Sequence, residues 1–372
     1  MNNVEELKKW RRDLHQIPEI GLKEVKTAAY IRSVLETLGY QWESIVETGT
    51  YVFIDNHQKE TIAFRSDIDA LEMTEKNHVD YVSKHEGMMH ACGHDGHVSA
   101  LLGLAMRLKN SKANFPHNIL LIFQPAEESP GAAKYIVDSG LFEKYRVKAI
   151  FGMHLMPFIE EGKIACKEGP LMAMCGELDV TIHGKGAHAG LPQNGIDSIA
   201  IASDAIQRYQ SLMARQMTPF QPVVLNIGKI QGGTARNSVA SSTELHGTIR
   251  CYSEKIFESL NTHIERIHQG LEVSYGCHIG WSCPPLYPPV INDKKLYQKF
   301  ITCVEDDYIE LNEPLMLSED FSYYQRAIPG IFFFLGTKSA KYTSGLHTET
   351  FNFNEEVLKK AVDLYYQLAL HI

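Results

Sequence analysis

The sequence predicts an α/β protein whose main domain, a sheet covered by helices on both faces, is interrupted by a small inserted domain. In the first 170 residues helical and strand patterns alternate, and the strands at 118–123 and 149–154 are almost continuously apolar, as in sheets buried on both faces. From about residue 173 the order of elements changes to β-α-β-β-α-β, the ferredoxin-like order. The 372 residues also exceed the roughly 250–300 at which a single core stops growing.

Each element of the main domain follows from hydrophobic periodicity or from a short apolar run between turn residues. The expected elements are helices near 3–15 and 23–38, strands near 51–55 and 61–66, a helix near 97–109, a strand at 118–123, a helix near 131–139 and a strand at 149–154. After the insertion come a helix near 293–305, the strand at 331–336 and a helix near 354–370. These last three are too few for a core of their own, so we expect them to complete the main domain.

The inserted domain begins with the alternating strand ELDVTIHG and contains two amphipathic helices. The apolar residues expected on their buried faces are Ile196, Ile199, Ile206 and Leu212, and then Ile256, Leu260, Ile264, Ile267 and Leu271. The proline-rich run at 283–290 favours a stiff return linker, because proline has no N–H for a helix or central strand. We therefore expect a main domain of residues 1–172 and 285–372 and an inserted domain of residues 173–284.

Composition excludes several classes of protein. The formal net charge is −9, and no basic cluster is dense enough to follow a phosphate backbone, so nucleic acid is not an expected partner. No apolar run approaches the roughly 18 residues of a membrane span, and the N-terminus lacks the apolar core of a signal peptide. Seven scattered cysteines without CxxC pairs favour a reducing compartment. The expected location is the cytoplasm.

The densest polar cluster is MHACGHDGH at 89–97, just before an apolar helix. Thiolate and imidazole bind zinc-class cations strongly, so this segment is a candidate metal site. A polar loop that caps the following helix is the alternative. The pattern alone does not choose the ligands among the candidates His90, Cys92, His94, Asp95 and His97.

Two acidic pairs are interpreted differently. Glu127 and Glu128 directly follow the buried strand at 118–123, and the carboxyl ends of strands are where α/β sheets gather their sites. Because adjacent acids point in different directions, one can bind a cation while its neighbour takes a proton from water. Glu319 and Asp320, in SEDFSYY, are assigned to a helix start and receive no catalytic role.

Other candidate residues also follow apolar strands. His154 lies at the end of the strand at 149–154, and His347 lies in a glycine-flanked loop after the strand at 331–336. Either histidine alone is more often structural, so their common position at strand ends is the argument for a site. Asp67 and Asp69 follow the strand near 61–66, where a carboxylate can orient a metal-bound imidazole.

Two loops of the inserted domain carry polar donors among glycines. HGKGAHAGLP holds His183, Lys185 and His188, and GGTARNSV holds Arg236 and Asn237. Such donors can grip a carboxylate or a developing oxyanion, although an ordinary flexible loop is an equal alternative.

Together these motifs resemble a known family. RSDIDAL, HEGMMHACGHD, FQPAEE, GMH, GKGAHAGLP, SEDFS and GLHTETF occur in the order and at the spacing found in the dinuclear metallo-amidohydrolases, which include aminoacylases, hippurate hydrolases, auxin-amino-acid hydrolases and N-acetyldiaminopimelate deacetylases. The resemblance covers essentially the whole chain. It implies a mixed sheet in a zinc-peptidase-like catalytic domain, with the inserted ferredoxin-like domain as a lid.

The resemblance also implies a set of metal ligands. Cys92 is expected to bridge two divalent cations, with His94 and His154 on one cation and Glu128 and His347 on the other. The thiolate favours zinc, and manganese, cobalt and nickel are the alternatives in such proteins.

The remaining roles implied by the resemblance are a base, a supporting acid and two substrate contacts. Glu127 matches the general base, and Asp67 matches the acid that supports the metal site. His188 and Asn237 match lid residues that contact the substrate. The match departs where Glu72 replaces a usual proline and where GLPQNG lacks a common histidine, which affects substrate details more than the chemistry.

The expected activity is hydrolysis of the amide bond of N-acyl-L-amino acids, with N-acetyldiaminopimelate mildly favoured as substrate. The alternatives are a dipeptidase on the same scaffold and a noncatalytic protein that binds metal or amino acids. The expected partner is the small-molecule substrate, and a homodimer through the lid domain is a further expectation, with His188 acting in its own subunit or in a neighbouring one.

Overall fold

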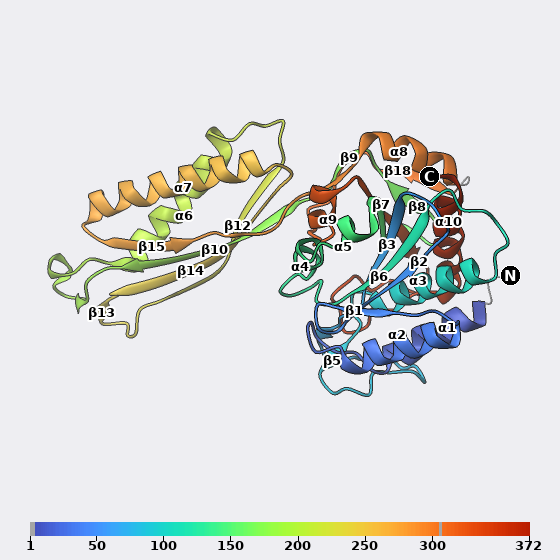
Figure 1. Ribbon diagram of the computed structural model, residues 1–372. Coiled ribbons are helices and arrows are strands. Elements are labelled where there is room, and N and C mark those ends of the chain that lie inside the picture. Colours follow the sequence, from blue (N-terminus) through green and yellow to red (C-terminus); the bar gives the residue numbers. More distant parts are fainter. Residues whose placement is uncertain (1–3, 305–306) are drawn as a thin grey trace. The chain divides into compact units, whose positions relative to one another are not determined.

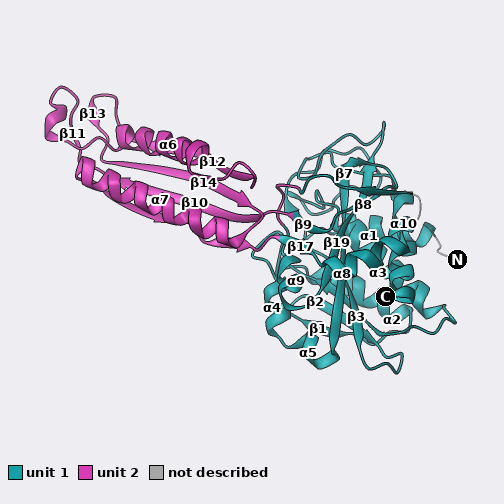
Figure 2. Ribbon diagram, turned by 90° about the horizontal axis from the view of Figure 1, so that it is seen from above, with its two compact units in different colours: residues 1–171, 290–314, 319–372 teal, residues 172–289, 315–318 magenta. Residues whose placement is uncertain are grey.

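The computed structural model describes residues 4–304 and 307–372, which form two compact units (Figure 2). Unit 1 comprises the described residues of 1–171, 290–314 and 319–372. Unit 2 comprises Met172–Pro289 together with Leu315–Ser318. The chain therefore contributes to unit 2 twice. The sequence pattern does not predict the second contribution, the four residues Leu315–Ser318.

Unit 1 is built on an eight-stranded mixed sheet in the order β1-β2-β6-β3-β7-β19-β8-β18. The neighbouring central strands β6, β3, β7 and β19 are parallel, whereas β2 and β8 join them antiparallel. The strands are β1 Glu43–Ile45, β2 Gly49–Ile54, β3 Thr61–Asp67, β6 Asn118–Gln124, β7 Val147–Glu160, β8 Ile164–Cys166, β18 Tyr308–Glu310 and β19 Gly330–Lys338. β3 and β6 are buried along their whole length, as their continuous apolar runs predict.

Helices cover both faces of this sheet, so the predicted α/β class is confirmed (Figure 1). One layer contains α1 Val4–His15, α2 Val25–Thr37, α3 His94–Lys109 and α10 Leu358–His371. The other layer contains α4 Ala133–Asp138, α5 Leu141–Tyr145 and α9 Ser322–Ala327. The remaining elements of unit 1 are β4 Leu71–Glu72, β5 Met88–Met89, β9 Gly169–Met172, β17 Val290–Asn292, α8 Lys294–Phe300 and the short 3₁₀ turns Ile301–Cys303 and Glu355–Val357.

Helix α3 is buried along most of its length, because α1 and α10 pack against it on the side away from the sheet. Gly103 makes this packing close. A Cβ atom at Gly103 would lie 2.5 Å from Val362 Cγ2 and 2.6 Å from Leu7 Cδ2. The first turn of this buried helix carries His94, so the candidate site is held on a rigid element.

Unit 2 has the ferredoxin-like topology, since its sheet runs β12-β14-β10-β15 with antiparallel neighbours. Its main elements are β10 Met174–His183, α6 Ser198–Arg215, β12 Val223–Gly232, β14 Ser242–Cys251, α7 Glu254–Tyr275 and β15 His278–Ser282. Shorter elements are β11 Ala187–His188, the 3₁₀ turn Pro192–Asn194, β13 Ser238–Val239 and β16 Pro285–Tyr287. Asp197 caps α6 by accepting the N–H groups of Ile199 and Ala200, at 3.0 and 3.3 Å.

One sequence expectation was wrong in detail. The buried face of α6 carries Ile201, Ala205 and Tyr209 as well as Leu212, while Ile199 is 46% exposed. Ile199 follows the buried Ser198 and so lies roughly 100° around the helix from the buried stripe. The helix expected near 131–139 is α4, and the additional short helix α5 starts after Gly140, whose φ of +76° suits a glycine turn.

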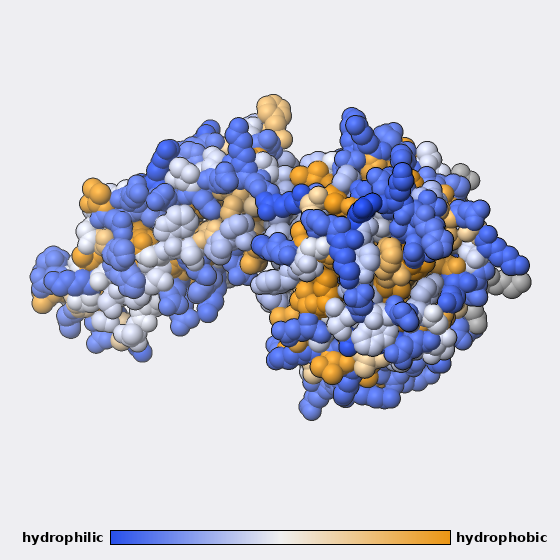
Figure 3. Space-filling model, viewed as in Figure 1, coloured by the Kyte–Doolittle hydropathy of each residue, from blue (hydrophilic) through white to orange (hydrophobic). Residues whose placement is uncertain are grey.

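The surface is mostly polar. Figure 3 shows hydrophilic side chains over most of the face drawn, on both units, with smaller apolar areas between them. Among the described residues, no helix combines the length and the apolar character that a membrane span requires.

Candidate metal centre

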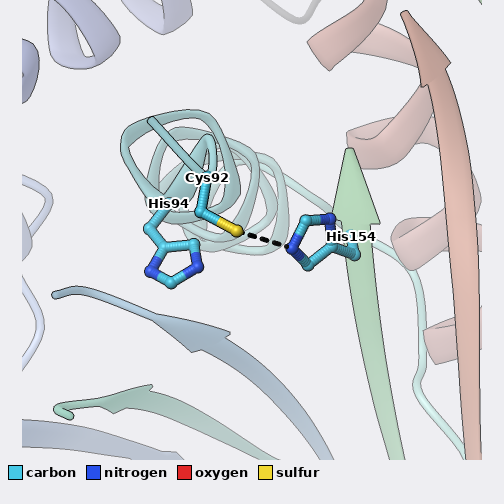
Figure 4. Close-up of side chains that lie close together, drawn as sticks. All are labelled: Cys92, His94 and His154. Atoms are coloured by element: carbon cyan, nitrogen blue, oxygen red, sulfur yellow. Dashed lines mark hydrogen bonds between the residues drawn. The ribbon is translucent and has the colours of Figure 1, made fainter. Parts of the chain in front are cut away.

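The first part of the site is the turn that begins α3. Cys92 precedes the helix, Gly93 stands at its N-cap with φ +89°, and His94 is its first residue (Figure 4). A Cβ atom at Gly93 would lie 3.2 Å from Leu155 Cδ1, so this turn packs tightly against the strand that carries His154. The glycine therefore permits the tight backbone turn between Cys92, which carries the thiol, and His94, which carries the imidazole.

The other parts come from the carboxyl ends of parallel strands, which meet at one edge of a sheet. Asp67 ends β3, and Glu127 and Glu128 follow the end of β6 at Gln124. His347 lies beyond β19 with φ +55°, and its N–H donates to the carbonyl oxygen of Ala91 at 2.9 Å. That bond ties the distant loop of His347 directly to the residue before Cys92.

The structure brings all five expected metal ligands together. One group consists of Cys92, His94 and His154, and a second consists of Cys92, Glu128 and His347. In each group the ligand atoms lie within 4.8 Å of one another. Cys92 Sγ is 3.3 Å from His154 Nε2, the dashed line in Figure 4, and Glu128 Oε1 is 3.0 Å from His347 Nε2. The thiol thus belongs to both groups, as a bridging ligand must.

Hydrogen bonds fix which imidazole nitrogen faces the site. His94 Nδ1 lies 2.9 Å from the carbonyl oxygen of Asp69, and His154 Nδ1 lies 2.6 Å from that of Leu155. A carbonyl only accepts, so each Nδ1 carries a proton and Nε2 is the ring nitrogen left to bind a cation. Such locked tautomers are typical of metal-binding histidines.

One buried atom at this point, His94 Nε2, lacks a hydrogen-bond partner among the described residues. Leaving a buried polar atom unsatisfied costs roughly 1–3 kcal/mol. A divalent cation would give this nitrogen a partner, and thiolate, imidazole and carboxylate are its usual ligands. The residues present therefore fit the metal pair that the sequence suggests.

Electrostatics also favour added positive charge. Burial, followed by the charges of Glu128 and Glu127, raises the pKa of the Cys92 thiol well above its usual value. Burial lowers the pKa of His154 to about 3, which keeps this imidazole neutral. Burial also opposes charge on His94, but Asp67, Asp69 and Glu128 together outweigh it and raise the pKa of His94 to about 10. Without a cation the surrounding carboxylates therefore favour the protonated forms of Cys92 and His94, and a bound cation would displace those protons.

Glu127 is a buried carboxyl beside the metal groups. Its oxygens approach within 4.8 Å of ligand atoms of His94 and Glu128, and also of Glu319 and Asp320. Burial and then the charge of Glu319 raise the pKa of Glu127 well above its usual value. A carboxyl with a raised pKa next to a metal site suits proton transfer near neutral pH.

Asp67 supports the site through His97. Its Oδ1 accepts from His97 Nδ1 at 2.6 Å, and its Oδ2 accepts from Arg65 at 2.8 Å. His97 Nε2 in turn accepts the N–H of Leu155 at 2.9 Å, which anchors the strand beside His154. Asp67 Oδ2 lies 3.9 Å from His94 Nε2, so His94 is oriented by Asp69 rather than by Asp67.

Sequence reasoning missed the buried network next to Glu127. The Arg65 guanidinium lies 3.0 Å from Glu319 Oε1 and 2.9 Å from Asp320 Oδ1, and its Nε donates to Gln124 at 2.7 Å. Glu319 and Asp320, which received no role from the sequence, therefore pack beside Glu127. Their short polar turn lies about 190 residues further along the chain and gives no local sign of its partners. The available signals were the motif SEDFS, which contains both residues and belongs to the family resemblance, and an arginine inside an apolar strand.

The two candidate loops of unit 2 pair with each other. His188 in β11 lies opposite Ser238 in β13, and Ala189 N–H donates to the Asn237 carbonyl oxygen at 3.0 Å. His188 Nδ1 accepts the N–H of Gly190 at 3.1 Å, so its Nε2 carries the proton and is a donor. Both His188 and Asn237 are exposed on unit 2.

The fold and the paired ligand groups define a metallohydrolase-type centre, and comparison with known proteins gives its family. The model of peptidase family M20/M25/M40 matches residues 63–371, so the chain belongs to this family. It is therefore a metal-dependent enzyme that hydrolyses amide bonds, and the family expected from the sequence motifs is confirmed.

Similar proteins include hydrolases from plants and bacteria. The IAA-amino acid hydrolase ILR1-like 4 of Arabidopsis thaliana is 38% identical over 371 residues, covering 96% of this chain and 84% of the plant protein. The N-acetyldiaminopimelate deacetylase of Listeria monocytogenes is 38% identical over 360 residues, covering 95% and 96% of the two chains. The crystal structure of Bacillus subtilis YXEP, described as a dinuclear metal binding peptidase of family M20, superposes with a TM-score of 0.85 at 32% identity over 98% of this chain and 97% of that one.

Proposed function

We propose that the protein hydrolyses the amide bond of N-acyl amino acids, with Glu127 as the general base. The observation that carries this proposal is the buried Glu127 carboxyl beside two ligand groups that share Cys92. The names of the plant and Listeria relatives support it, because one hydrolyses IAA-amino acids and the other deacetylates N-acetyldiaminopimelate. N-acetyldiaminopimelate is accordingly the first substrate to assay.

Five side chains would hold two divalent cations in this site. Cys92 would contact both, His94 and His154 would hold one, and Glu128 and His347 would hold the other. Bound cations of this kind lower the pKa of water to about 7 and polarise the carbonyl of the substrate. The thiol and imidazole donors favour zinc, with manganese, cobalt and nickel as the metals to compare in reconstitution.

Glu127 would move the proton of the reaction. It takes a proton from the attacking water, whose oxygen forms the new bond to the carbonyl carbon. It then gives that proton to the nitrogen as the C–N bond breaks, which releases a carboxylate and a free amine. Its raised pKa makes Glu127 a stronger base for the first transfer, and its burial keeps bulk water from competing for the proton.

Other residues would position these groups. Asp67 and His97 would hold the strand next to His154, and the main chain of Asp69 would keep His94 in its Nδ1–H form. His188, with a proton on Nε2, and Asn237 are the proposed substrate contacts of unit 2, where a donor can stabilise negative charge on the carbonyl oxygen.

The test compares Glu127→Ala with Glu128→Ala. We expect Glu127→Ala to keep its bound metal and to lose turnover by about 10²–10⁴-fold, the usual contribution of a general base. Glu128→Ala should instead lose metal, since it removes a ligand. Metal content by mass spectrometry and kcat on a panel of N-acyl amino acids measure the two effects. Activity retained in Glu127→Ala would remove Glu127 from the base role.

The same panel separates the alternative functions. Faster release of amine from N-acetyl and N-benzoyl amino acids than from dipeptides supports the proposal, and the reverse order would indicate a dipeptidase. A protein that binds metal and amino acids without any turnover would be the noncatalytic alternative.

A further inference from the structure

A polar cleft lies in unit 1, with walls that contact segments near the candidate metal centre. It has a volume of about 840 Å³ and is lined by three lysines, Lys23, Lys26 and Lys84, together with His85. None of the three ammonium groups is ion-paired with a carboxylate in the part of the chain that the structure describes. Three ammonium groups that form no ion pair, together in one concave site, are candidate donors for an anion.

The walls of this lysine cleft are continuous with the segments that carry the site. The carbonyl oxygen of Glu19 accepts the N–H of Ala70 at 2.8 Å, directly after Asp69. A Cβ atom at Gly21 would lie only 2.3 Å from the carbonyl oxygen of Ser129, so the wall packs directly on the loop that follows Glu128. Strand β5, at the other wall, ends three residues before Cys92. The lysine cleft therefore shares its walls with the segments that hold Asp69, Glu128 and Cys92.

One of the three cations is held in place before any ligand binds. Lys26 Nζ lies 2.8 Å from His85 Nε2, and His85 Nδ1 lies 2.7 Å from the carbonyl oxygen of Pro18. The carbonyl must accept, so Nδ1 carries the proton and the neutral imidazole accepts from the lysine. The Lys26 side chain is thus positioned by His85 and has two further N–H donors for a ligand.

Three glutamates, Glu19, Glu72 and Glu86, also line the lysine cleft. They limit the ways in which an anion can be bound there. Glu19 is already engaged, because its Oε2 accepts from the N–H groups of Lys26 and Thr27 and from the Thr27 hydroxyl. Glu72 and Glu86 are exposed. Their charges weaken any general positive field, so binding of an anion here depends on direct contact with the ammonium groups.

We propose that the lysine cleft binds a carboxylate at the far end of the substrate, so that the enzyme favours N-acyl amino acids with an acidic side chain. This inference rests on the proposed hydrolysis of N-acyl amino acids. It adds a specificity site made of Lys23, Lys26 and Lys84 to the centre that performs the chemistry.

The experiment compares N-acetylglutamate with N-acetylglutamine, whose side chain has the same shape but no charge. We expect the parent enzyme to favour N-acetylglutamate by about tenfold in kcat/KM, and the triple variant Lys23→Met, Lys26→Met, Lys84→Met to lose that preference mainly through KM. Lys26→Arg should retain part of it. The matched control is Lys112→Met, an exposed lysine beyond the opposite end of α3, which should leave the preference intact. Metal content and circular dichroism verify that each variant is folded and loaded.

The outcomes distinguish failure of the lysine-cleft proposal from failure of the proposed hydrolase function. A parent enzyme that hydrolyses both substrates without preference, or a triple variant that keeps the preference, would overturn the lysine cleft while leaving the hydrolase function intact. A parent enzyme that hydrolyses no N-acyl amino acid would overturn both.

Discussion

At the scale of single residues, the site depends on which atom of each side chain is free. In His94 and His154, Nδ1 donates to a main-chain carbonyl oxygen, which leaves Nε2 for a cation. In Asp67, both carboxylate oxygens accept hydrogen bonds, one from His97 and one from Arg65, so this residue acts as a support. The difference between a ligand and a supporting residue thus lies in its hydrogen bonds.

Glu319 should set the pH dependence of the reaction through Glu127. Glu127 must be ionised to accept a proton, so kcat/KM falls as the pH drops through its pKa. The charge of Glu319 raises that pKa, and removing the charge should lower it. We expect Glu319→Gln to move the acidic limb of the kcat/KM profile to lower pH. An unchanged limb, or one displaced to higher pH, would show that Glu319 does not tune the base.

At the scale of elements, close packing of α3 holds the metal loop. The helix lies against β3 on one side and against α1 and α10 on the other, with contact at Gly103. Because its first residue is His94, any shift of this helix would displace a proposed ligand.

The same substitution in two helices should have opposite effects. Gly103→Ala would force the new methyl group into Val362 and Leu7, and we expect it to destabilise unit 1 by about 1–3 kcal/mol. Gly270→Ala in α7 meets no atom within 4 Å and should stabilise unit 2 by about 0.5–1 kcal/mol, since alanine restricts the unfolded chain. Chemical unfolding of the two variants and the parent measures both. Equal effects in the two helices would contradict the packing argument.

At the scale of the whole unit, a buried ionic network joins distant parts of the chain. Asp95 in α3 accepts from Arg11 at 2.9 Å and lies 2.7 Å from His15, both in α1. Arg11 also contacts Glu355 at 3.4 Å, near the start of α10. Helices α1 and α3 and the segment that precedes α10 are therefore linked through Asp95, the residue next to His94.

This network should make unit 1 sensitive to acid. Burial opposes ionisation of Asp95, but the charge of Arg11 and the hydrogen bond to His15 outweigh it and hold the Asp95 pKa well below its usual value. A carboxyl whose pKa is depressed in the folded state contributes stability above its unfolded pKa of about 3.9, and that stability is lost as the pH falls below it. We expect Asp95→Asn to lower the free energy of unfolding at pH 7 and to flatten its decline in acid. Urea unfolding from pH 3 to 7 measures the slope, and an equally steep decline in the variant would exclude Asp95 as its source.

The sequence by itself determined the order of elements, the insertion of a ferredoxin-like domain and the polar residues at strand ends. These follow from short-range physics, because hydrophobic period and turn chemistry are local properties. The motif resemblance then selected His94 from the candidates in MHACGHDGH. The buried face of α6 shows the limit of local pattern, since its core contacts centre on Ile201, Ala205 and Tyr209 and leave Ile199 exposed.

Only the tertiary structure decided which distant side chains meet. Glu127 and Glu319 are separated by 192 positions, and their approach depends on strand order and on the chain's return from unit 2. The Arg65 network and the lysine cleft arise in the same way. Such contacts are set by how the whole apolar surface is buried at once, and no window of sequence contains that information.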